Sequence, residues 1–543
     1  MNPAGDTDVL ILGAGLAAAL RLRQLGYRVA VCDRSALPRP QIGESLTPGL
    51  NNLLDFLGMA DLLATVPQCV GLATRRRWSH ADREDAGMTR GVSHRIVDRG
   101  RFDHALLERV RAAGGLCLLP TRVRGIDGEA GAWRVRIETA GRIQVLGARF
   151  VLDARGRRSV ARETTPTAPA LLSLWAEYDG DDVEAIRIEA LPQCWLWGAR
   201  LPDGASRVMA FCDPATPRRE AGGDPEAWLR AMLRQSHLFA QVANARWCTR
   251  VQGCAATPYV AHEVWSDGQA KLGDAAFALD PLSSSGVERA MRFSLQAVTA
   301  IHTALSSTAD AVLARDYFHD SLVQAVARHL RWTRDCYAQA WPATAHPFWQ
   351  VRATDFALPD ATTPILCCLR EVLAAQRLRS LAPPHLPANH VAHDDPSAVL
   401  QAHVSLCPRT RFVTQPCVVD DRVQRRLAID HPNLERPLAW LDGIDVVPLF
   451  DAIATVANLA QLIEQWSTRM QLRSATRLVG WLLHKGVVVV ELMSESGSGA
   501  EARQSPSDPT AGSDAGKKGQ GAISIGRAPY DLLSQQDHPA NDR

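Results

Sequence analysis

Apolar residues at the start of the chain fall into short runs separated by a glycine turn and a helical period. Val9-Leu10-Ile11-Leu12 is an apolar run of the buried parallel-strand type. Gly13-Ala14-Gly15 follows directly, and a helical pattern then extends from about Leu16 to Leu25. Arg28–Cys32 has the pattern of a second strand. The order of strand, tight turn, helix and strand predicts a parallel, Rossmann-like α/β unit.

The pattern changes further along the chain. A helix is predicted from about Arg101 to Ala113, and strand-like runs then extend to Leu152. From about Leu171 to Cys212 the residues alternate between apolar and polar and are often aromatic, which is typical of a separate antiparallel sheet. Residues 287–383 are largely helical in period. The predicted fold class is therefore α/β, with an antiparallel-sheet domain inserted into a Rossmann-like domain.

The C-terminal part is predicted to form a compact unit of its own. Asp445–Gln465 and Ser474–His484 have helical spacing, and the strand-like run Val487–Val490 follows Gly486. Helices that end at a glycine before a short ribbon resemble a small winged-helix domain. The predicted parts are an α/β domain (1–165 and 263–390), an inserted substrate domain (166–262), a winged-helix-like domain (396–495) and a disordered tail (496–543) whose composition cannot bury a core.

Composition and charge exclude several classes of protein. Of the 543 residues 46% are apolar, and 60 basic residues stand against 58 acidic ones, so we expect a globular chain without a strong attraction to nucleic acid. No run of 18 uncharged apolar residues occurs, and Met1–Asp8 lacks a signal pattern, so a cytoplasmic protein that does not enter a membrane is expected. The 12 cysteines have no zinc-like spacing, and no metal site is predicted.

The first candidate site is the glycine turn. Gly13 allows the tight turn, Gly15 lets the backbone approach a pyrophosphate, and the small Ala18 lets the helix lie close to the strand. The start of the helix offers free N–H groups to the phosphates. Asp33 ends the second strand, where a carboxylate can accept from ribose hydroxyls. Together these residues predict a dinucleotide site.

A second motif distinguishes FAD from NAD. Asp274 follows a strand-like segment, where it can accept from a ribityl hydroxyl that only a flavin has. The chain then continues through Pro281 to Ser285-Gly286-Val287, where a helix begins. That helix would direct its positive end at the N1/O2 edge of the flavin, which becomes anionic on reduction. FAD is the predicted cofactor.

At this point the chain resembles a known group of flavoproteins, the superfamily of aromatic hydroxylases, geranylgeranyl reductases and flavin-dependent tryptophan halogenases. Further motifs carry the resemblance: Ile42-Gly43-Glu44-Ser45-Leu46-x-Pro48, Val97-Asp98-Arg99 with Arg101-Phe102-Asp103, and Val151-Leu152-Asp153-Ala154-Arg155-Gly156. The resemblance implies FAD contacts from Arg34, Ser45, Arg99 and Asp153. It also implies that Glu44, Ser285 and Gly286 lie beside the reacting end of the flavin.

Three departures from the halogenase pattern favour oxygen transfer over halogen transfer. The halogenases pass the halogen through a lysine near the substrate, whereas this chain has no lysine before Lys271. Ser283 stands where tryptophan halogenases carry a glutamate. Their Trp-x-Trp-x-x-Pro signature survives only as Trp195-Leu196-Trp197 with one residue more before Pro202. We therefore expect hydroxylation of an electron-rich aromatic ring through a flavin C4a-hydroperoxide.

The residues expected to form the substrate pocket are Trp195, Trp197, Arg76 and His80. The two tryptophans stand at i and i+2 of a strand and therefore share one face of the sheet. Arg76 could bind an acidic substrate, and His80 and Glu44 could act on a proton. For each of these residues, packing or exposure to solvent is the simpler interpretation.

The substrate class follows from the resemblance together with the C-terminal unit. From Gln401 to Glu495, ten basic residues balance ten acidic ones, which argues against binding to a duplex and favours a peptide- or protein-binding module. This combination resembles the flavin monooxygenases that mature quinohemoprotein amine dehydrogenase, which hydroxylate a tryptophan within a polypeptide to begin a tryptophylquinone. Expected partners are a peptide or protein substrate, O2, and either NAD(P)H or a flavin reductase. A halogenase, a small-molecule aromatic hydroxylase and a non-redox flavoprotein remain open as alternatives.

Overall fold

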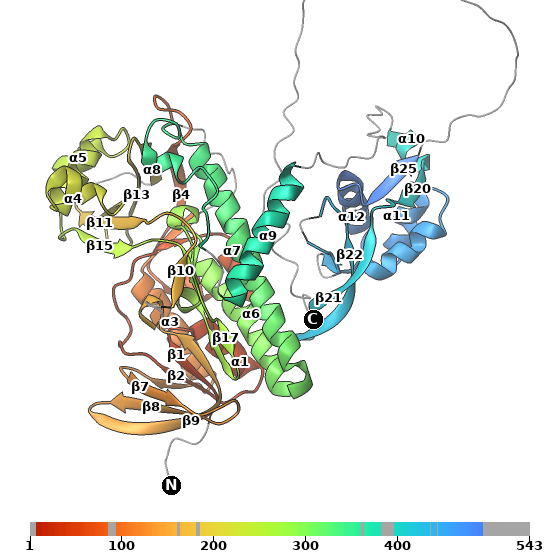
Figure 1. Cartoon of the computed structure of the whole chain (residues 1–543), viewed down its shortest axis with the longest axis horizontal. Helices are drawn as coiled ribbons and strands as arrows, with labels where there is room; N and C mark the ends of the chain where they lie inside the picture. The colour runs from red at the N-terminus through yellow and green to blue at the C-terminus, as the bar shows by residue number, and fades with distance from the viewer. Residues whose placement is uncertain are drawn as a thin grey trace, which may run out of the picture. The chain divides into compact units, whose positions relative to one another are not determined.

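The computed structural model describes residues 7–84, 94–159, 163–180, 185–359, 363–381, 396–434, 436–441 and 444–491. These residues form two compact units (Figure 1). Unit 1 contains the described residues up to Arg377 together with Asp421–Val423, and unit 2 contains the remainder. The predicted tail at 496–543 lies outside the described residues.

The nucleotide-binding part of unit 1 is a largely parallel sheet. Its strands, in spatial order, are β17 (Trp265–Ser266), β18 (Gln269–Lys271), β9 (Arg142–Ala154), β1 (Thr7–Gly13), β2 (Val29–Cys32) and β6 (Leu116–Leu118). An antiparallel extension of β7 (Arg122–Asp127) and β8 (Trp133–Thr139) joins through the long β9. Val9 to Leu12 are completely buried. The predicted first strand and the helix that follows it, α1 (Leu16–Gln24), are confirmed.

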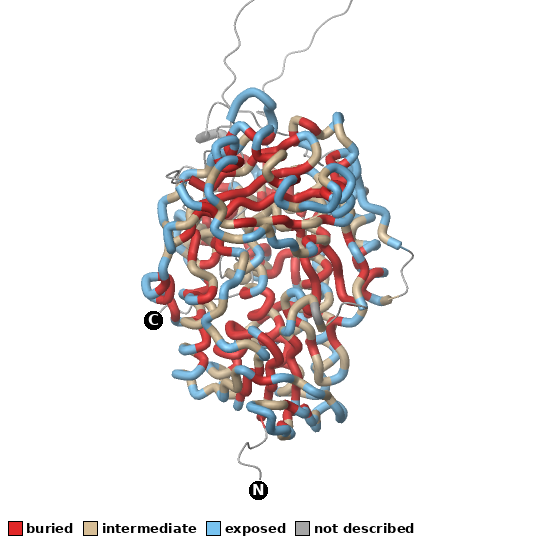
Figure 2. Tube along the Cα trace, turned by 90° about the vertical axis from the view of Figure 1, so that its left-hand side faces the viewer, coloured by how far each residue is buried: buried red, intermediate tan, exposed pale blue. Residues whose placement is uncertain are grey.

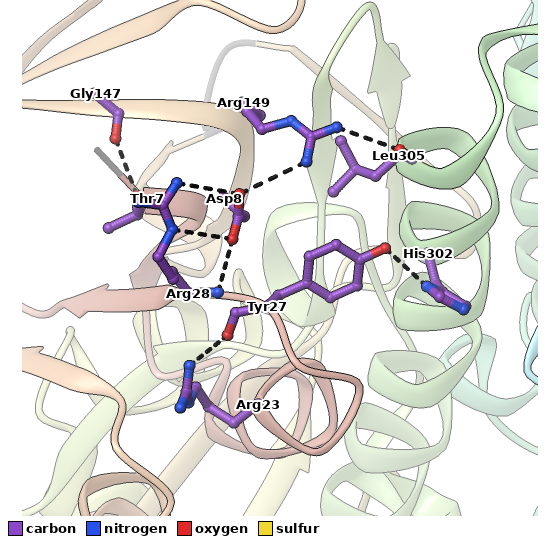
Figure 3. Close-up of polar contacts among 9 residues, drawn as sticks. All are labelled: Thr7, Asp8, Arg23, Tyr27, Arg28, Gly147, Arg149, His302 and Leu305. Carbon is purple, nitrogen blue, oxygen red and sulfur yellow. Dashed lines mark hydrogen bonds and ion pairs between the residues drawn. The ribbon is translucent and has the colours of Figure 1, made fainter. Parts of the chain in front are cut away.

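Polar contacts fix the amino-terminal edge of this sheet (Figure 3). The Asp8 carboxylate accepts from the backbone N–H of Arg28 at 2.8 Å and pairs with Arg149 at 3.6 Å. The Tyr27 hydroxyl lies 2.8 Å from Nδ1 of His302, which is in α6 (Gly286–Ser306). The sheet and α6 are therefore joined at the amino-terminal ends of the strands. The opposite edge, at the carboxyl ends of the strands, is where a ligand is expected.

A second, mainly antiparallel sheet forms the other part of unit 1. Its strands, in spatial order, are β15 (Gln252–Ala255), β11 (Leu172–Tyr178), β14 (Ser206–Cys212), β13 (Cys194–Arg200), β12 (Ala185–Leu191), β4 (Gln68–Arg77), β5 (His94–Val97) and β3 (Ser45–Leu46). The antiparallel strands predicted within 171–212 are confirmed. The sheet also takes in β3, β4 and β5 from the N-terminal part of the chain, which the alternating pattern did not reveal.

Helices cover both sheets. The predicted helix near Arg101 is α3 (Arg99–Ala112), capped by the Asp98 carboxylate, which accepts from the N–H of Arg101. Helix α5 (Pro225–Gln235) packs its buried Trp228 against β11, β13 and β14. Helix α7 (Ala311–Ala338) lies beside α6, as Figure 1 shows. Figure 2 shows buried segments running through the strands and exposed segments at the loops.

Unit 2 has its own apolar core. Strand β20 (His403–Leu406) pairs with β25 (Val488–Glu491), and β21 (Arg411–Val419) pairs with β22 (Arg422–Asp430). The longest helices of this unit are α11 (Leu459–Ser467) and α12 (Leu472–His484). The Trp466 indole N–H donates to the carbonyl oxygen of Leu449 at 2.9 Å. The single helix predicted over Asp445–Gln465 is wrong. A 3-10 helix, η7 (Val447–Ala454), ends before α11 begins at its Asn458 cap, because Pro448 and the Asn458 side chain each favour a helix start.

Candidate active site

The turn between β1 and α1 leaves room for a close phosphate. Gly13 has a φ of +97°, and a Cβ atom there would lie 2.3 Å from the carbonyl oxygen of Ala154. A Cβ atom at Gly15 would lie 2.9 Å from Ile11 Cγ2. Only glycine fits these two positions. Among the described residues no side chain caps the start of α1, so its N–H groups are available to a pyrophosphate.

A cavity of about 1180 Å³ extends from this turn to the start of α6 and to the second sheet. Its size exceeds the range of roughly 300–1,000 Å³ typical of small-molecule sites, as expected for a dinucleotide together with a substrate. Most of the residues predicted from the sequence line it together: Gly13, Gly15, Asp33, Arg34, Glu44, Ser45, Arg99, Trp195, Trp197, Asp274, Pro281, Ser285, Gly286 and Val287. The glycine turn and this set of donors and acceptors fit FAD.

Four predicted residues lie outside the lining. Ala18 is buried within α1, where a small side chain lets the helix pack closely. The Asp153 carboxylate pairs with Arg155, with Oδ2 2.7 Å from Nη2. Arg155 lines the cavity, whereas Asp153 does not. Arg76 and His80 are exposed, because the end of β4 and the loop after it turn towards solvent. The geometry therefore gives no support to these two residues as substrate ligands.

Asp274 is placed by a short 3-10 turn, η4 (Gly273–Ala275), directly after β18. Its Oδ2 accepts from Nε of Arg157 at 3.1 Å, and the Tyr259 hydroxyl donates to its carbonyl oxygen. The Asp274 side chain is 55% exposed. Its Oδ1 has no partner among the described residues and can accept from a ribityl hydroxyl.

Arg99 is fixed at the start of α3. Its Nη1 donates to the carbonyl oxygen of Gly43 at 3.0 Å, and its Nη2 pairs with Asp103 at 3.2 Å. The arginine thus joins the α3 motif to the segment that carries Glu44 and Ser45. Two of the three further motifs that carry the resemblance therefore meet at one wall of the cavity.

Glu44 is held in a buried charge cluster. It forms an ion pair with Arg207 of β14, which also pairs with Glu177, and the backbone N–H of Gly43 donates to its Oε2 at 2.9 Å. The guanidinium carbon of Arg207 lies 4.7 Å from the centre of the Trp175 ring. Burial lowers the pKa of Arg207 to about 10 and raises the pKa of Glu177. The cluster ties the Glu44 segment to the second sheet.

A directed hydrogen-bond chain connects the turn before α6 with the tryptophan wall. The Trp195 indole N–H donates to the Tyr337 hydroxyl at 3.1 Å, and that hydroxyl donates to Oδ2 of Asp280 at 3.1 Å. Oδ1 of Asp280 accepts from the N–H of Leu282 at 3.0 Å. His329, eight residues before Tyr337 in α7, lies with its Nε2 3.2 Å from the Asp280 carbonyl oxygen. Burial raises the pKa of Asp280 to about 6.

The end of the cavity at the second sheet is aromatic. The Trp195 ring stacks on Phe211 with centroids 3.8 Å apart and planes at 12°. Trp197 stands beside them on the same face, as the i, i+2 spacing predicts, and its indole N–H is buried without a partner among the described residues. Met209 completes this wall. Stacked rings and a thioether form a surface suited to a flat aromatic substrate.

Several residues of the site could not be predicted from the sequence. Arg207, Tyr337 and Arg157 contact partners between 117 and 163 positions away, and no local motif marks them. Asp280 could have been predicted from the sequence, because it directly precedes Pro281 in the second flavin motif. Within the described residues no cluster of His, Cys, Asp or Glu could hold a metal ion, and no helix is long and apolar enough to cross a bilayer.

Comparisons with known proteins agree with this fold. The chain is 23% identical over 350 residues to a tryptophan 2-halogenase of Chondromyces crocatus, and the match covers 59% of this chain and 65% of that protein. Two solved structures share the fold. One is the peptidyl tryptophan dihydroxylase QhpG, essential for tryptophylquinone cofactor biogenesis, with a TM-score of 0.64 and 24% identity over 89% of this chain and 100% of that one. The other is the flavin-dependent halogenase CmlS, with a TM-score of 0.66 and 17% identity over 90% of this chain and 96% of that one.

The family comparison supports FAD as the cofactor. The family model described as the FAD binding domain matches residues 6–330, which include the glycine turn, Asp274 and the start of α6. The chain belongs to the FAD binding domain family.

Proposed function

We propose that this protein is an FAD-dependent monooxygenase that hydroxylates an electron-rich aromatic ring, and that the ring is a tryptophan carried by a peptide or protein. The observation that carries the proposal is the aromatic end of the cavity, formed by Trp195, Phe211 and Trp197, together with the lack of a lysine among the described residues of its lining. Such a wall can orient an indole, whereas no amine is present there to hold a halogen.

Bound FAD, once reduced, supplies the activated oxygen, and the protein supplies position and exclusion of water. The stacked Trp195 and Phe211 rings provide a rigid face against which a flat substrate can lie. The chain from Trp195 through Tyr337 to Asp280 fixes the orientation of that face. We place the reacting end beside Ser285 and Gly286, where N–H groups at the start of α6 favour negative charge.

Glu44 fits a positioning role better than a role as a free base. Its carboxylate is buried and paired with Arg207, so taking up a ring proton would leave a buried guanidinium with one acid partner fewer. Asp280 is the alternative acceptor at the cavity wall. Its pKa of about 6 makes it ionised at neutral pH yet basic enough to take up a proton.

The peptide-borne substrate is supported by the extent of the similarity to QhpG. The match covers 89% of this chain and all of that one, so it extends beyond the FAD domain. We propose that unit 2 is a winged-helix-like module that holds the carrier polypeptide while the target ring enters the cavity. Contact at two places raises the local concentration of the ring, so a weak pocket suffices. The electron source is NAD(P)H or a partner reductase.

Halogen transfer is the second candidate, because the relative from Chondromyces crocatus is named a tryptophan 2-halogenase. Ser283 lines the cavity at the position of the halogenase glutamate, and the lysine is lacking. These two departures favour the monooxygenase.

A product assay separates the two reactions. Holoenzyme, supplied with NADH and a flavin reductase, is incubated with tryptophan, indole or a tryptophan-containing peptide, with and without bromide. A gain of about 16 or 32 mass units that bromide does not change supports monooxygenation. A brominated product would show that the chain is a halogenase.

A further inference from the structure

One partly buried cation lines the cavity at the start of α6. Arg289 lies in the first turn of α6 and lines the cavity. Its Nε donates to Oγ of Ser285 at 2.7 Å, and Ser285 Oγ lies 2.7 Å from Oγ of Ser283. The side chain therefore folds back over the start of the helix. As a result, the guanidinium and the helix N-terminus present positive charge to the same part of the cavity.

Arg289 has no carboxylate to neutralise it within the described residues. The nearest acid, Glu288, has its own partners: it pairs with Arg292 at 2.9 Å and accepts from the Thr47 hydroxyl. Burial lowers the pKa of Arg289, Glu288 offsets part of that effect, and Arg328 and Arg292 add to it. Even a partly buried cation is destabilised when it lacks a counterion, and an anionic ligand in the cavity would relieve that cost.

The position of Arg289 indicates which anionic ligand would lie beside it. The chain runs from Asp274, at the ribityl contact, to Ser285 in eleven residues, and between them Asp280 is joined through Tyr337 to Trp195. The start of α6 thus lies between the nucleotide end of the cavity and its aromatic end. The ring system of FAD has to occupy this stretch if it is to meet a substrate at Trp195.

We propose that Arg289 binds the N1–C2=O edge of the flavin and stabilises the negative charge that this edge carries after reduction. The inference rests on the proposed placement of FAD, and it does not depend on which ring is oxidised. It adds a residue that the sequence motifs did not mark, and it predicts that the flavin potential depends on one side chain.

Sulfite tests the proposal without substrate or O2. Sulfite adds to N5 of oxidised flavin through its sulfur electron pair, and the ring keeps the resulting negative charge at N1–C2=O. Arg289→Gln holoenzyme should bind sulfite at least about tenfold more weakly than wild type, and Arg289→Lys should bind within about threefold of it. A tenfold change for a two-electron couple corresponds to about 30 mV, so the midpoint potential should fall by about that amount or more.

Arg292→Gln is the matched control. It removes one positive charge from the same helix, three residues further on, at a side chain that pairs with Glu288 and does not line the cavity. It should change sulfite binding by less than about threefold. Equal losses in the two glutamine variants, or an Arg289→Gln variant that keeps FAD and wild-type sulfite binding, would overturn the proposal.

An Arg289→His variant keeps the test decisive if Arg289→Gln does not retain FAD. Its positive charge can be switched on between pH 8 and pH 6. Relative to wild type at each pH, sulfite binding should then become tighter as the pH falls, and a constant ratio would refute the role of the charge. Because no product is measured, these results stand apart from the test for monooxygenation.

Discussion

Asp274 shows how one carboxylate can serve both the protein and the cofactor. Arg157 holds its Oδ2, and Oδ1 remains available to a ribityl hydroxyl. Asp274→Ala should lower FAD affinity by about 10- to 100-fold, since a hydrogen bond to a charged group is worth roughly 1.5–3 kcal/mol. Asp274→Asn keeps a hydrogen-bond acceptor, so its FAD affinity should fall less than that of Asp274→Ala. The ratio of flavin to protein absorbance after dialysis measures this, and equal occupancy in the alanine variant would remove the assignment.

Tyr337 is the only link in the hydrogen-bond chain that both accepts and donates. In Tyr337→Phe, the Trp195 N–H and the Asp280 Oδ2 would both lose this partner, and both residues are buried. We expect the free energy of unfolding of the holoenzyme to fall by about 2–4 kcal/mol, because each unsatisfied buried group costs roughly 1–3 kcal/mol. Tyr27→Phe, which removes a half-buried hydroxyl contact to His302, should cost under about 1.5 kcal/mol. Urea unfolding compares the two, and equal losses would contradict the account.

At the scale of elements, the β1–α1 turn is the part that the sequence predicted most completely. Gly13→Ala would place a methyl group 2.3 Å from the carbonyl oxygen of Ala154 at a φ of +97°. We expect this variant to lose FAD. Gly26→Ala is a matched control, because Gly26 has a φ of +87° but nothing within 4 Å of the added methyl. It should cost about 1 kcal/mol of stability and keep its flavin, as absorbance of the purified proteins would show. Retained flavin in Gly13→Ala would argue against the phosphate turn.

Elements with a strong local signal were predictable, and elements that depend on distant partners were not. The first strand, α1 and the strands within 171–212 follow from periodicity and glycine stops. Strand β4 was not expected in the second sheet, because its pairing with β12 joins residues more than a hundred positions apart. The break between η7 and α11 was missed because the apolar spacing continues through it. The same reasoning covers the site: Gly13 and Asp274 stand in motifs, whereas Tyr337 and Arg207 meet their partners only in the fold.

At the scale of the whole molecule, we expect FAD binding to depend on unit 1 and binding of a polypeptide substrate to depend on unit 2. Unit 1 contains the whole cavity lining, and unit 2 has its own core around Trp466 and Leu482. A chain lacking residues 396–543 also loses Asp421–Val423 of unit 1, but it keeps every residue of the cavity lining. It should therefore bind FAD and be reduced as the full chain is. It should keep activity on free indole and lose at least about tenfold in kcat/KM on a polypeptide substrate. Full activity of the shortened chain on the polypeptide would contradict a carrier-binding role for unit 2.

The origin of the transferred atom tests the central claim most directly. Turnover of a tryptophan-containing polypeptide by the reduced holoenzyme in ¹⁸O₂ should give a product heavier by about 18 or 36 mass units, with the label on the indole ring. Unlabelled product from the same reaction in H₂¹⁸O and ordinary O2 is the control, and it should gain about 16 or 32 mass units. Label from water in place of O2, or a halogen isotope pattern, would contradict an FAD-dependent monooxygenase.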